Sequence, residues 1–191
     1  MSYVELHTHS AYSFLDGTSL PEELVAAALA HGYSAMALTD HDSVAGSMEW
    51  AVSAGALGLR ALHGAEVSLE DGRHLTLLVA DARGWAGLCR IITRAHRDTR
   101  GPTADDPPSI VGGGKRATRR DLLGAVVPLE FVLEHAEGLV CLTGCARHGV
   151  QDEATARRLL DAFGPERLRV ELQRPFARHD RAQGRARTEL A

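Results

Sequence analysis

Two histidines near the start of the chain are spaced to share one metal ion. His7 and His9 follow a short apolar segment, Tyr3 to Leu6, whose residue types are typical of a β-strand. Side chains two residues apart on a strand point to the same face, so both imidazoles can face one ion. Imidazole suits zinc, iron or nickel, and Asp16 adds a harder oxygen ligand. Such a pair also occurs in strands that bind nothing, so a metal site needs further support.

That support comes from residues of ligand type that follow three other apolar segments. They are Asp40 and His41 after 35–38, His63 and Glu66 after 59–62, and Cys145 after 138–143. Each has a simpler explanation: the first pair can belong to a helix-capping loop, Glu66 can be an exposed strand-edge carboxylate, and Cys145 can be a small buried residue. One metal site explains them together, whereas the simpler explanations are independent of one another. We therefore predict a site for several metal ions.

The remaining histidines and cysteines are less informative. His74 and His96 can each reach the same site, although a surface position at a strand start or a helix end is the simpler interpretation. The other histidines are expected at the surface, at helix ends or in loops: His31, His135, His148 and His179. Cys141 lies inside a predicted strand and is expected in the core.

The elements that would position these residues alternate along the chain. Strands are expected at 3–6, 35–38, 59–62, 67–69, 74–79, 138–143 and 168–173, and helices at 21–29, 44–54, 85–96, 128–135, 151–163 and 177–191. A capping box at Ser19 to Glu22 opens the first helix, Asp71-Gly72 is a tight turn, and residues 99–118 read as a mobile loop. This alternation predicts an α/β fold with a mostly parallel sheet, open or closed, in which the C-terminal strand ends form one rim.

Composition excludes several classes of protein. A chain of 191 residues with 45% hydrophobic and 24% charged residues fits one soluble domain, and the bulk net charge of −4 by itself points to neither a nucleic-acid nor a membrane partner. No apolar run approaches the length of a membrane span, and no leader peptide is evident. Three sparse cysteines fit a reducing compartment, so we expect a cytoplasmic protein without a disulfide framework.

Taken in order, these motifs resemble a known family. His7-Thr8-His9-Ser10, Ser13-x-x-Asp16-Gly17, Thr39-Asp40-His41-Asp42 and His63-Gly64-Ala65-Glu66 are similar to successive motifs of the polymerase and histidinol phosphatase (PHP) domain. The stretches at 74–78, 138–145 and 170–175 resemble the N-terminal domain of the bacterial DNA polymerase III alpha subunit, and look closest to its error-prone form. The resemblance covers essentially the whole chain.

The resemblance implies a distorted, TIM-like (β/α) barrel of seven strands with up to three divalent metal ions, usually zinc, manganese or iron, used for phosphoester hydrolysis. The residues on its ligand positions are His7, His9, Asp16, His41, Glu66 and Cys145, with Glu66 expected to bridge two ions. His96 is our choice for the remaining middle ligand, and Asp40, His63 and His74 are expected as reserves or as supports of the ligands.

One departure from the family pattern affects the expected activity. The family ends its site with an Asp-x-His motif after another strand, and this sequence has none after Leu168. We therefore expect residues 1–191 to form a partial PHP domain that binds fewer metal ions and hydrolyses phosphoesters poorly.

The expected partners follow from the polymerase context: DNA, whose 3′ end would be the substrate in proofreading, and other polymerase domains or replication and repair proteins. Arg116, Arg119 and Arg120 could contact DNA or could simply face solvent. Two alternatives remain open. One is a structural or partner-docking module without catalysis, and the other is a free-standing small-molecule phosphatase, which would need the closing motif.

Overall fold

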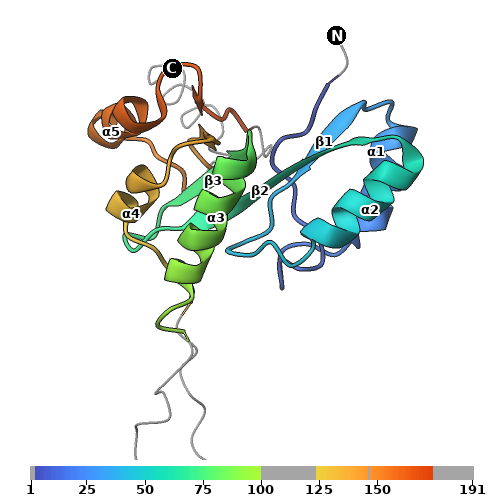
Figure 1. Ribbon diagram of the computed structural model, residues 1–191, viewed down its shortest axis with the longest axis horizontal. Helices are drawn as coiled ribbons and strands as arrows, with labels where there is room; N and C mark the ends of the chain where they lie inside the picture. Colours follow the sequence, from blue (N-terminus) through green and yellow to red (C-terminus); the bar gives the residue numbers. More distant parts are fainter. Residues whose placement is uncertain (1–2, 100–123, 146, 174–191) are drawn as a thin grey trace, which may run out of the picture.

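The computed structural model in Figure 1 describes residues 3–99, 124–145 and 147–173. Five strands form one sheet in the order β1 (Ala35–Leu38), β2 (Arg60–Ser68), β3 (His74–Val79), β4 (Leu139–Leu142) and β5 (Leu168–Arg169). The helices are α1 (Pro21–Ala30), α2 (Ser47–Leu57), α3 (Ala82–Ala95), α4 (Leu129–Glu134) and α5 (Glu153–Phe163). The expected helix at 177–191 lies outside the described residues. So does the expected loop at 99–118, apart from its first residue.

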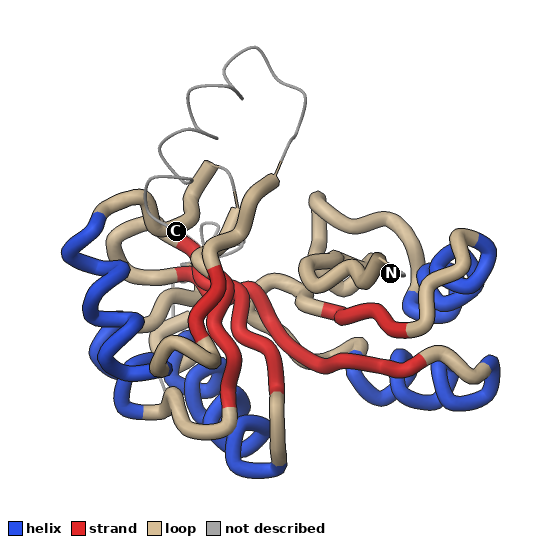
Figure 2. The backbone as a smooth tube through the Cα atoms, turned by 90° about the horizontal axis from the view of Figure 1, so that it is seen from above, coloured by secondary structure: helices blue, strands red, loops and turns tan. Residues whose placement is uncertain are grey.

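The directions of the strands differ in part from the expected architecture. The α/β class is confirmed, but β2 pairs antiparallel with β3 and β3 antiparallel with β4, so the sheet is mixed rather than mostly parallel. The tight turn at Asp71-Gly72 reverses the chain between β2 and β3 and gives the first antiparallel pair. The described residues form an open sheet with β1 and β5 at its edges, and they do not form the closed seven-stranded barrel that the resemblance implies (Figure 2).

Strand β2 is longer than expected and joins two predicted strands into one. Its first residues pair with β1, from Arg60 to His63, and its last residues pair with β3, from Gly64 to Ser68. Gly64 allows a close approach at the change of partner, because a Cβ there would lie 2.4 Å from the carbonyl oxygen of Leu77. Glu66 therefore lies within a strand that continues past the end of β1, not in a loop after it.

The segment that carries the paired histidines runs alongside β1. The strand expected at 3–6 is reduced to a single parallel bridge between Glu5 and Met36. Backbone hydrogen bonds from the N–H of Ala37 to Glu5 and from the N–H of Thr39 to Thr8 hold the segment in place, at 2.8 and 2.9 Å. His7 and His9 are thus placed beside the C-terminal end of β1.

Two main groups of apolar side chains hold these elements together. One surrounds the fully buried Trp50 and joins α1 and α2 to β1, whose four residues are all buried, as expected for this strand. The larger group joins β2, β3 and β4 to α3, α4 and α5, with Leu77 and Ile91 fully buried. Figures 1 and 2 show α1 and α2 beside β1 and the other helices toward β3, β4 and β5.

The helix ends follow local capping chemistry. Helix α1 starts at Pro21 as expected, but its N-cap is Leu20 and not Ser19, and the Glu23 carboxylate accepts the Leu20 N–H at 2.7 Å. Helix α3 begins after Asp81, whose carboxylate accepts the N–H groups of Arg83 and Gly84. Among the described segments we find no helix with the length and apolar character that crossing a lipid bilayer requires.

Candidate metal centre

Glu66 lies at the centre of the histidine cluster and is only 1% exposed. Its Oε2 contacts Nε2 of His7 and lies 3.1 Å from Nε2 of His9. Its Oε1 contacts Nδ1 of His74 and lies 4.0 Å from Nδ1 of His41. Burial favours the protonated acid, but the hydrogen bonds to the surrounding imidazoles outweigh it and hold the pKa of Glu66 far below its usual range. One carboxylate therefore presents its two oxygens to two different sets of histidines.

Asp16 joins two of the imidazoles on the solvent side of the cluster. Its Oδ2 lies 2.9 Å from Nδ1 of His9 and 2.9 Å from Nε2 of His41. The contact with His41, followed by that with His9, lowers the pKa of the Asp16 carboxyl. The Asp16 side chain is 56% exposed, so a ligand or an ion can reach this part of the cluster from solvent.

The Asp40 carboxylate holds the loop that carries His9 and Asp16 through hydrogen bonds. This carboxylate is 2% exposed and accepts hydrogen bonds from the Ser10 N–H, the Ser10 hydroxyl and the Ser13 hydroxyl, at 2.7, 2.8 and 2.7 Å. Ser13 Oγ in turn accepts the N–H of His41 at 3.0 Å. Asp40 thus bonds to the serines of this loop, and Ser13 links it to the backbone of His41.

A second part of the cluster combines His74, Cys145 and His148. The His74 N–H donates to the His148 carbonyl at 2.8 Å, and the His148 N–H donates to Cys145 Sγ at 3.3 Å. Hydrogen bonds to Cys145 and Glu66 raise the pKa of His74 to about 10. Burial alone would raise the pKa of Cys145, but the contacts with His74 and with backbone N–H groups lower it, which favours the thiolate that binds metals.

Four overlapping sets of side chains have ligand atoms within 4.8 Å of one another. They are His7, His9 and Glu66; His9, Asp16 and His41; His41, Glu66 and His74; and His74, Cys145 and His148. Six residues predicted from the sequence are brought together here, and the reserve residue His74 joins them. His148, expected at the surface, also joins; its Cys-x-x-His spacing from Cys145 is the sequence signal that could have identified it.

Two other candidate residues are not brought into this cluster. His96, our choice for the middle ligand, lies outside all four sets, and its Nε2 donates instead to the backbone carbonyl of Asp42 at 2.8 Å. His63 lies on β2 three residues before Glu66, and side chains an odd number of residues apart on a strand point to opposite faces. Its ring packs against Trp85 with centroids 5.9 Å apart, and burial lowers its pKa.

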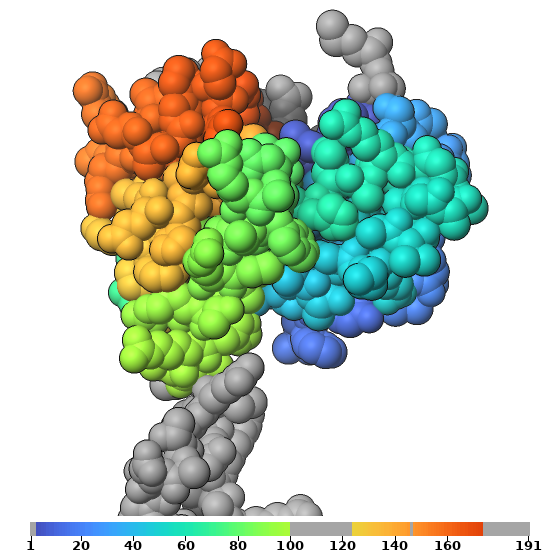
Figure 3. Space-filling model, viewed as in Figure 1, coloured from blue at the N-terminus to red at the C-terminus, as the bar shows by residue number. Residues whose placement is uncertain are grey.

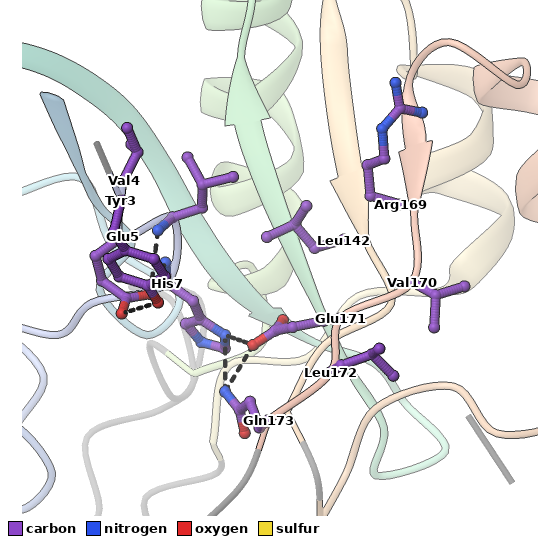
Figure 4. A pocket seen from close by; sticks show the side chains of 11 residues that line it. Tyr3, Val4, Glu5, His7, Leu142, Arg169, Val170, Glu171, Leu172 and Gln173 are labelled. Atoms are coloured by element: carbon purple, nitrogen blue, oxygen red, sulfur yellow. Dashed lines mark hydrogen bonds and ion pairs between the residues drawn. The ribbon is translucent and has the colours of Figure 1, made fainter. Parts of the chain in front are cut away.

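Glu171 is a functional candidate that we did not assign from the sequence. Its Oε1 lies 2.7 Å from Nδ1 of His7 and accepts a hydrogen bond from Gln173 at 2.6 Å (Figure 4). Its backbone N–H donates to Thr143 Oγ1 at 3.0 Å, which ties it to the end of β4. The sequence analysis places Glu171 inside the strand expected at 168–173, whereas β5 ends at Arg169, so the carboxylate follows a strand end as His41 and Cys145 do.

The contact with Glu171 also decides how His7 is oriented. Burial disfavours the charged ring, yet hydrogen bonds to Glu171 and Glu66 raise the pKa of His7 to about 10. A carboxylate on Nδ1 holds the ring so that Nε2 faces Glu66, which is how carboxylates orient metal-binding histidines. The two residues also line a cavity of about 570 Å³ between the N-terminal segment and residues 169–173 (Figure 4).

The donor set fits divalent metal ions. Imidazoles and a thiolate suit zinc and iron, and the carboxylates of Asp16 and Glu66 also suit manganese. The group that contains Cys145 has the softest donors, and it and the group that contains Asp16 each include one exposed residue. The arrangement is therefore consistent with a metal site.

Solved structures share this fold. A candidate metal-dependent phosphoesterase from Bifidobacterium adolescentis is 19% identical, with a TM-score of 0.57 over 98% of this chain and 84% of that one. An amidohydrolase from Chromobacterium violaceum is 23% identical, with a TM-score of 0.53 over 87% of this chain and 75% of that one. At these identities the similarity establishes the fold alone.

Sequence relatives are more similar but much longer. Error-prone DNA polymerases from Symbiobacterium thermophilum and Mycobacterium bovis are 37% and 36% identical over 100% and 90% of this chain. The chain spans only 18% and 16% of the lengths of these two proteins. The characteristic sequence pattern of the PHP domain matches residues 5–175, and the chain therefore belongs to the PHP domain family.

Proposed function

We propose that this chain forms a metal-dependent phosphoesterase centre of an error-prone DNA polymerase, with a DNA 3′ end as its substrate and with weak hydrolysis, because its sequence has no closing Asp-x-His motif after Leu168. The observation that carries the proposal is the placement of Glu66, whose two buried oxygens face two sets of histidines. A carboxylate shared in this way is suited to bridge two cations, and paired cations are a common device for phosphoester hydrolysis. The similarity to error-prone DNA polymerases supports the choice of DNA.

Each ligand group has a proposed place in this centre. His7, His9 and Glu66 would hold one divalent cation, and Asp16 with His41 would supply ligands to a site that is more open to solvent. The other oxygen of Glu66 with His74, beside the Cys145 thiolate, would supply ligands to a further site. When bound, zinc, manganese or iron would lower the pKa of a water molecule and offset the charge of the phosphate.

The protein itself contributes orientation and charge. Glu171 holds His7 through Nδ1, and Asp40 holds the loop that carries Asp16. Asp16 also keeps His9 and His41 on one side of the cluster, where a phosphoester can approach from solvent. These supports keep the ligands in place before a substrate binds, so less ordering is needed during the reaction.

The test compares metal content and hydrolysis in matched variants. Purified protein is loaded with zinc or manganese, and hydrolysis of bis-p-nitrophenyl phosphate and of a 3′-labelled DNA oligonucleotide is measured. His9→Ala should lower metal content and hydrolysis together, whereas His31→Ala, which changes an exposed histidine outside the four ligand sets, should leave both unchanged. Equal hydrolysis by wild type and His9→Ala would contradict the proposal.

A second candidate is a structural role for the metal. The candidate ligands come from the N-terminal segment, β2, β3 and the loop after β4, so bound cations would join parts of the chain that are far apart in sequence. Metal binding then contributes to folding. This role predicts that a chelator lowers the melting temperature of a protein that hydrolyses neither substrate, whereas the first candidate predicts metal-dependent hydrolysis.

A further inference from the structure

Helix α3 carries a line of arginines on its solvent side. Arg83, Arg90 and Arg94 lie within about 40° of one another around the helix axis and extend over about 16 Å, at 100° and 1.5 Å per residue. Arg97 follows directly after the helix end, and α3 contains no acidic residue. In a chain with a net charge of −4, this line is a local concentration of positive charge.

The charge of this line is only partly neutralised. Arg83 pairs with Glu137, and Arg94 lies 3.7 Å from the exposed Asp98. Within the described part of the chain, Arg90 and Arg97 have no carboxylate within ion-pair distance. Helix α5 differs, because both of its arginines pair with glutamates: Arg157 with Glu153 and Arg158 with Glu130.

The arginines line a groove together with apolar residues. The groove has a volume of about 740 Å³, within the range of ligand sites. Its apolar lining residues are Cys89, Ile92 and Phe131, and its polar ones are Arg90, Arg94 and Arg97 together with Thr93 and His96. Figure 1 shows α4, which supplies Phe131, beside α3, and Figure 3 shows both helices on the same face of the molecule.

The aromatic residue of the groove is held in one orientation. Phe131 is half-buried and stacks on His135, with ring centroids 4.2 Å apart and planes at 25°. His135 is itself fixed, because Nδ1 donates to the carbonyl of Phe131 at 2.8 Å. A fixed ring beside a line of guanidinium groups provides a flat apolar surface next to positive charge.

We infer that this groove binds single-stranded nucleic acid. The arginines neutralise successive phosphates, and Phe131 offers a surface on which an unpaired base stacks, which is how proteins bind single strands without regard to sequence. Arginine is suited to this role because its planar fork binds phosphate oxygens in pairs. A duplex keeps its bases stacked inside, so it has no unpaired base to place on Phe131, and an acidic peptide has no base at all.

The groove is separate from the candidate ligands, so this inference does not rest on the proposed phosphoesterase activity. None of the residues that line the groove belongs to the four ligand sets. Binding is therefore expected in the presence of a chelator. If the chain bound no metal, this inference would still hold. If it bound no nucleic acid, the proposed metal centre would still hold.

The experiment measures fluorescence anisotropy of a labelled 20-nucleotide oligothymidylate with the full chain in EDTA. Arg90→Glu with Arg94→Glu should weaken binding at least tenfold and reduce the slope of log affinity against log salt by about 1.4, since each phosphate contact on a single strand contributes about 0.7. The matched control, Arg60→Glu with Arg157→Glu, makes the same charge change at exposed positions outside α3 and should alter affinity less than twofold. Phe131→Ala should weaken binding to the oligonucleotide severalfold with the salt slope unchanged.

Three outcomes would overturn the inference. Equal losses in the α3 variant and the control would mean that only overall charge matters. Tighter binding to a 20-base-pair duplex than to the single strand would exclude the base-stacking role of the groove. Equal binding of a labelled 20-residue polyglutamate, with the same dependence on Arg90 and Arg94, would assign the groove to acidic proteins. Circular dichroism of each variant verifies that it is folded.

Discussion

The two halves of the metal centre hold their ligands by different means. In the first half, His9, Asp16 and His41 depend on a buried polar network in which Asp40 accepts three hydrogen bonds. In the second half, His74 and Cys145 depend on strand ends and on backbone hydrogen bonds of a short loop. Glu66 belongs to both halves, because one of its oxygens faces each.

The comparison shows how one site can combine rigid and adaptable parts. A buried carboxylate with satisfied hydrogen bonds fixes its neighbours, and removing an acceptor leaves donors buried without partners. Backbone contacts of a loop are less affected by substitution of one side chain. The first half should therefore be more sensitive to substitution of the residues that support the ligands, and the second half to substitution of the ligands themselves.

The largest effect is expected when the shared carboxylate is changed. Glu66→Gln removes the negative charge that both halves use and should weaken zinc and manganese binding more than about 100-fold, beyond the range for supporting residues. Isothermal titration calorimetry and metal analysis of the dialysed protein measure this loss. The same change at the exposed Glu70, four residues later, serves as the control. Unchanged metal stoichiometry in Glu66→Gln would show that the halves do not share this residue.

Asp40→Asn should affect the first half alone. An amide offers one acceptor oxygen in place of two, so some of the three donors lose their partner, and metal affinity in this half should fall about 10- to 100-fold. The free energy of unfolding should fall by about 1–3 kcal/mol, measured by chemical denaturation. With cobalt as the metal, the thiolate charge-transfer absorption of Cys145 should persist while total uptake falls. Loss of that absorption would show that the halves are not independent.

Metal affinity should rise with pH in both halves. The pKa of His7 and that of His74 are both raised to about 10, so the metal-free protein holds both protons at neutral pH and must release them on binding. For each proton released, zinc binding should become about tenfold tighter per pH unit between pH 6 and 8. Calorimetry in buffers of different ionisation enthalpy counts the released protons, and a count of zero would contradict these protonation states.

The same shifts predict the pH dependence of stability without metal. Because these pKa values are raised above their ordinary value of 6.5, the stabilisation from the histidine–glutamate pairs is complete below pH 6.5 and is lost as the pH rises through 10. Denaturation of the EDTA-treated protein at pH 6, 8 and 10 measures this trend. An increase in stability as the pH rises toward 10 would contradict this prediction.

The smallest effect is expected at His96. His96→Ala removes a hydrogen bond to the Asp42 carbonyl and should cost about 1 kcal/mol of unfolding free energy, with metal affinity unchanged within experimental error. His74→Ala is the matched comparison, since it should remove most metal binding from the second half while the first half still binds. If His96→Ala lost more metal than His74→Ala, His96 would be a ligand although it lies outside the four ligand sets.

The spacing of residues predicted the first half of the cluster more completely than the second. His7, His9 and Asp16 lie within ten residues, and His41 follows a strand that is buried along its whole length, so local patterns locate them. His74 is only a reserve in the sequence analysis because a surface position at a strand start is the simpler interpretation. Strand β3 is antiparallel to β2, and its start therefore lies at the edge where β1 ends.

The sequence by itself determined the α/β class, the burial of β1 and the imidazole, carboxylate and thiol chemistry of the site. The tertiary structure decided that the described sheet is open and mixed, that Glu66 lies within β2, and that His74 and Glu171 face the cluster while His96 does not. The physical reason is that alternation of apolar residues reports which side of a strand is buried. It carries no information on which strand lies beside it or in which direction, because those choices depend on hydrogen bonds between distant segments.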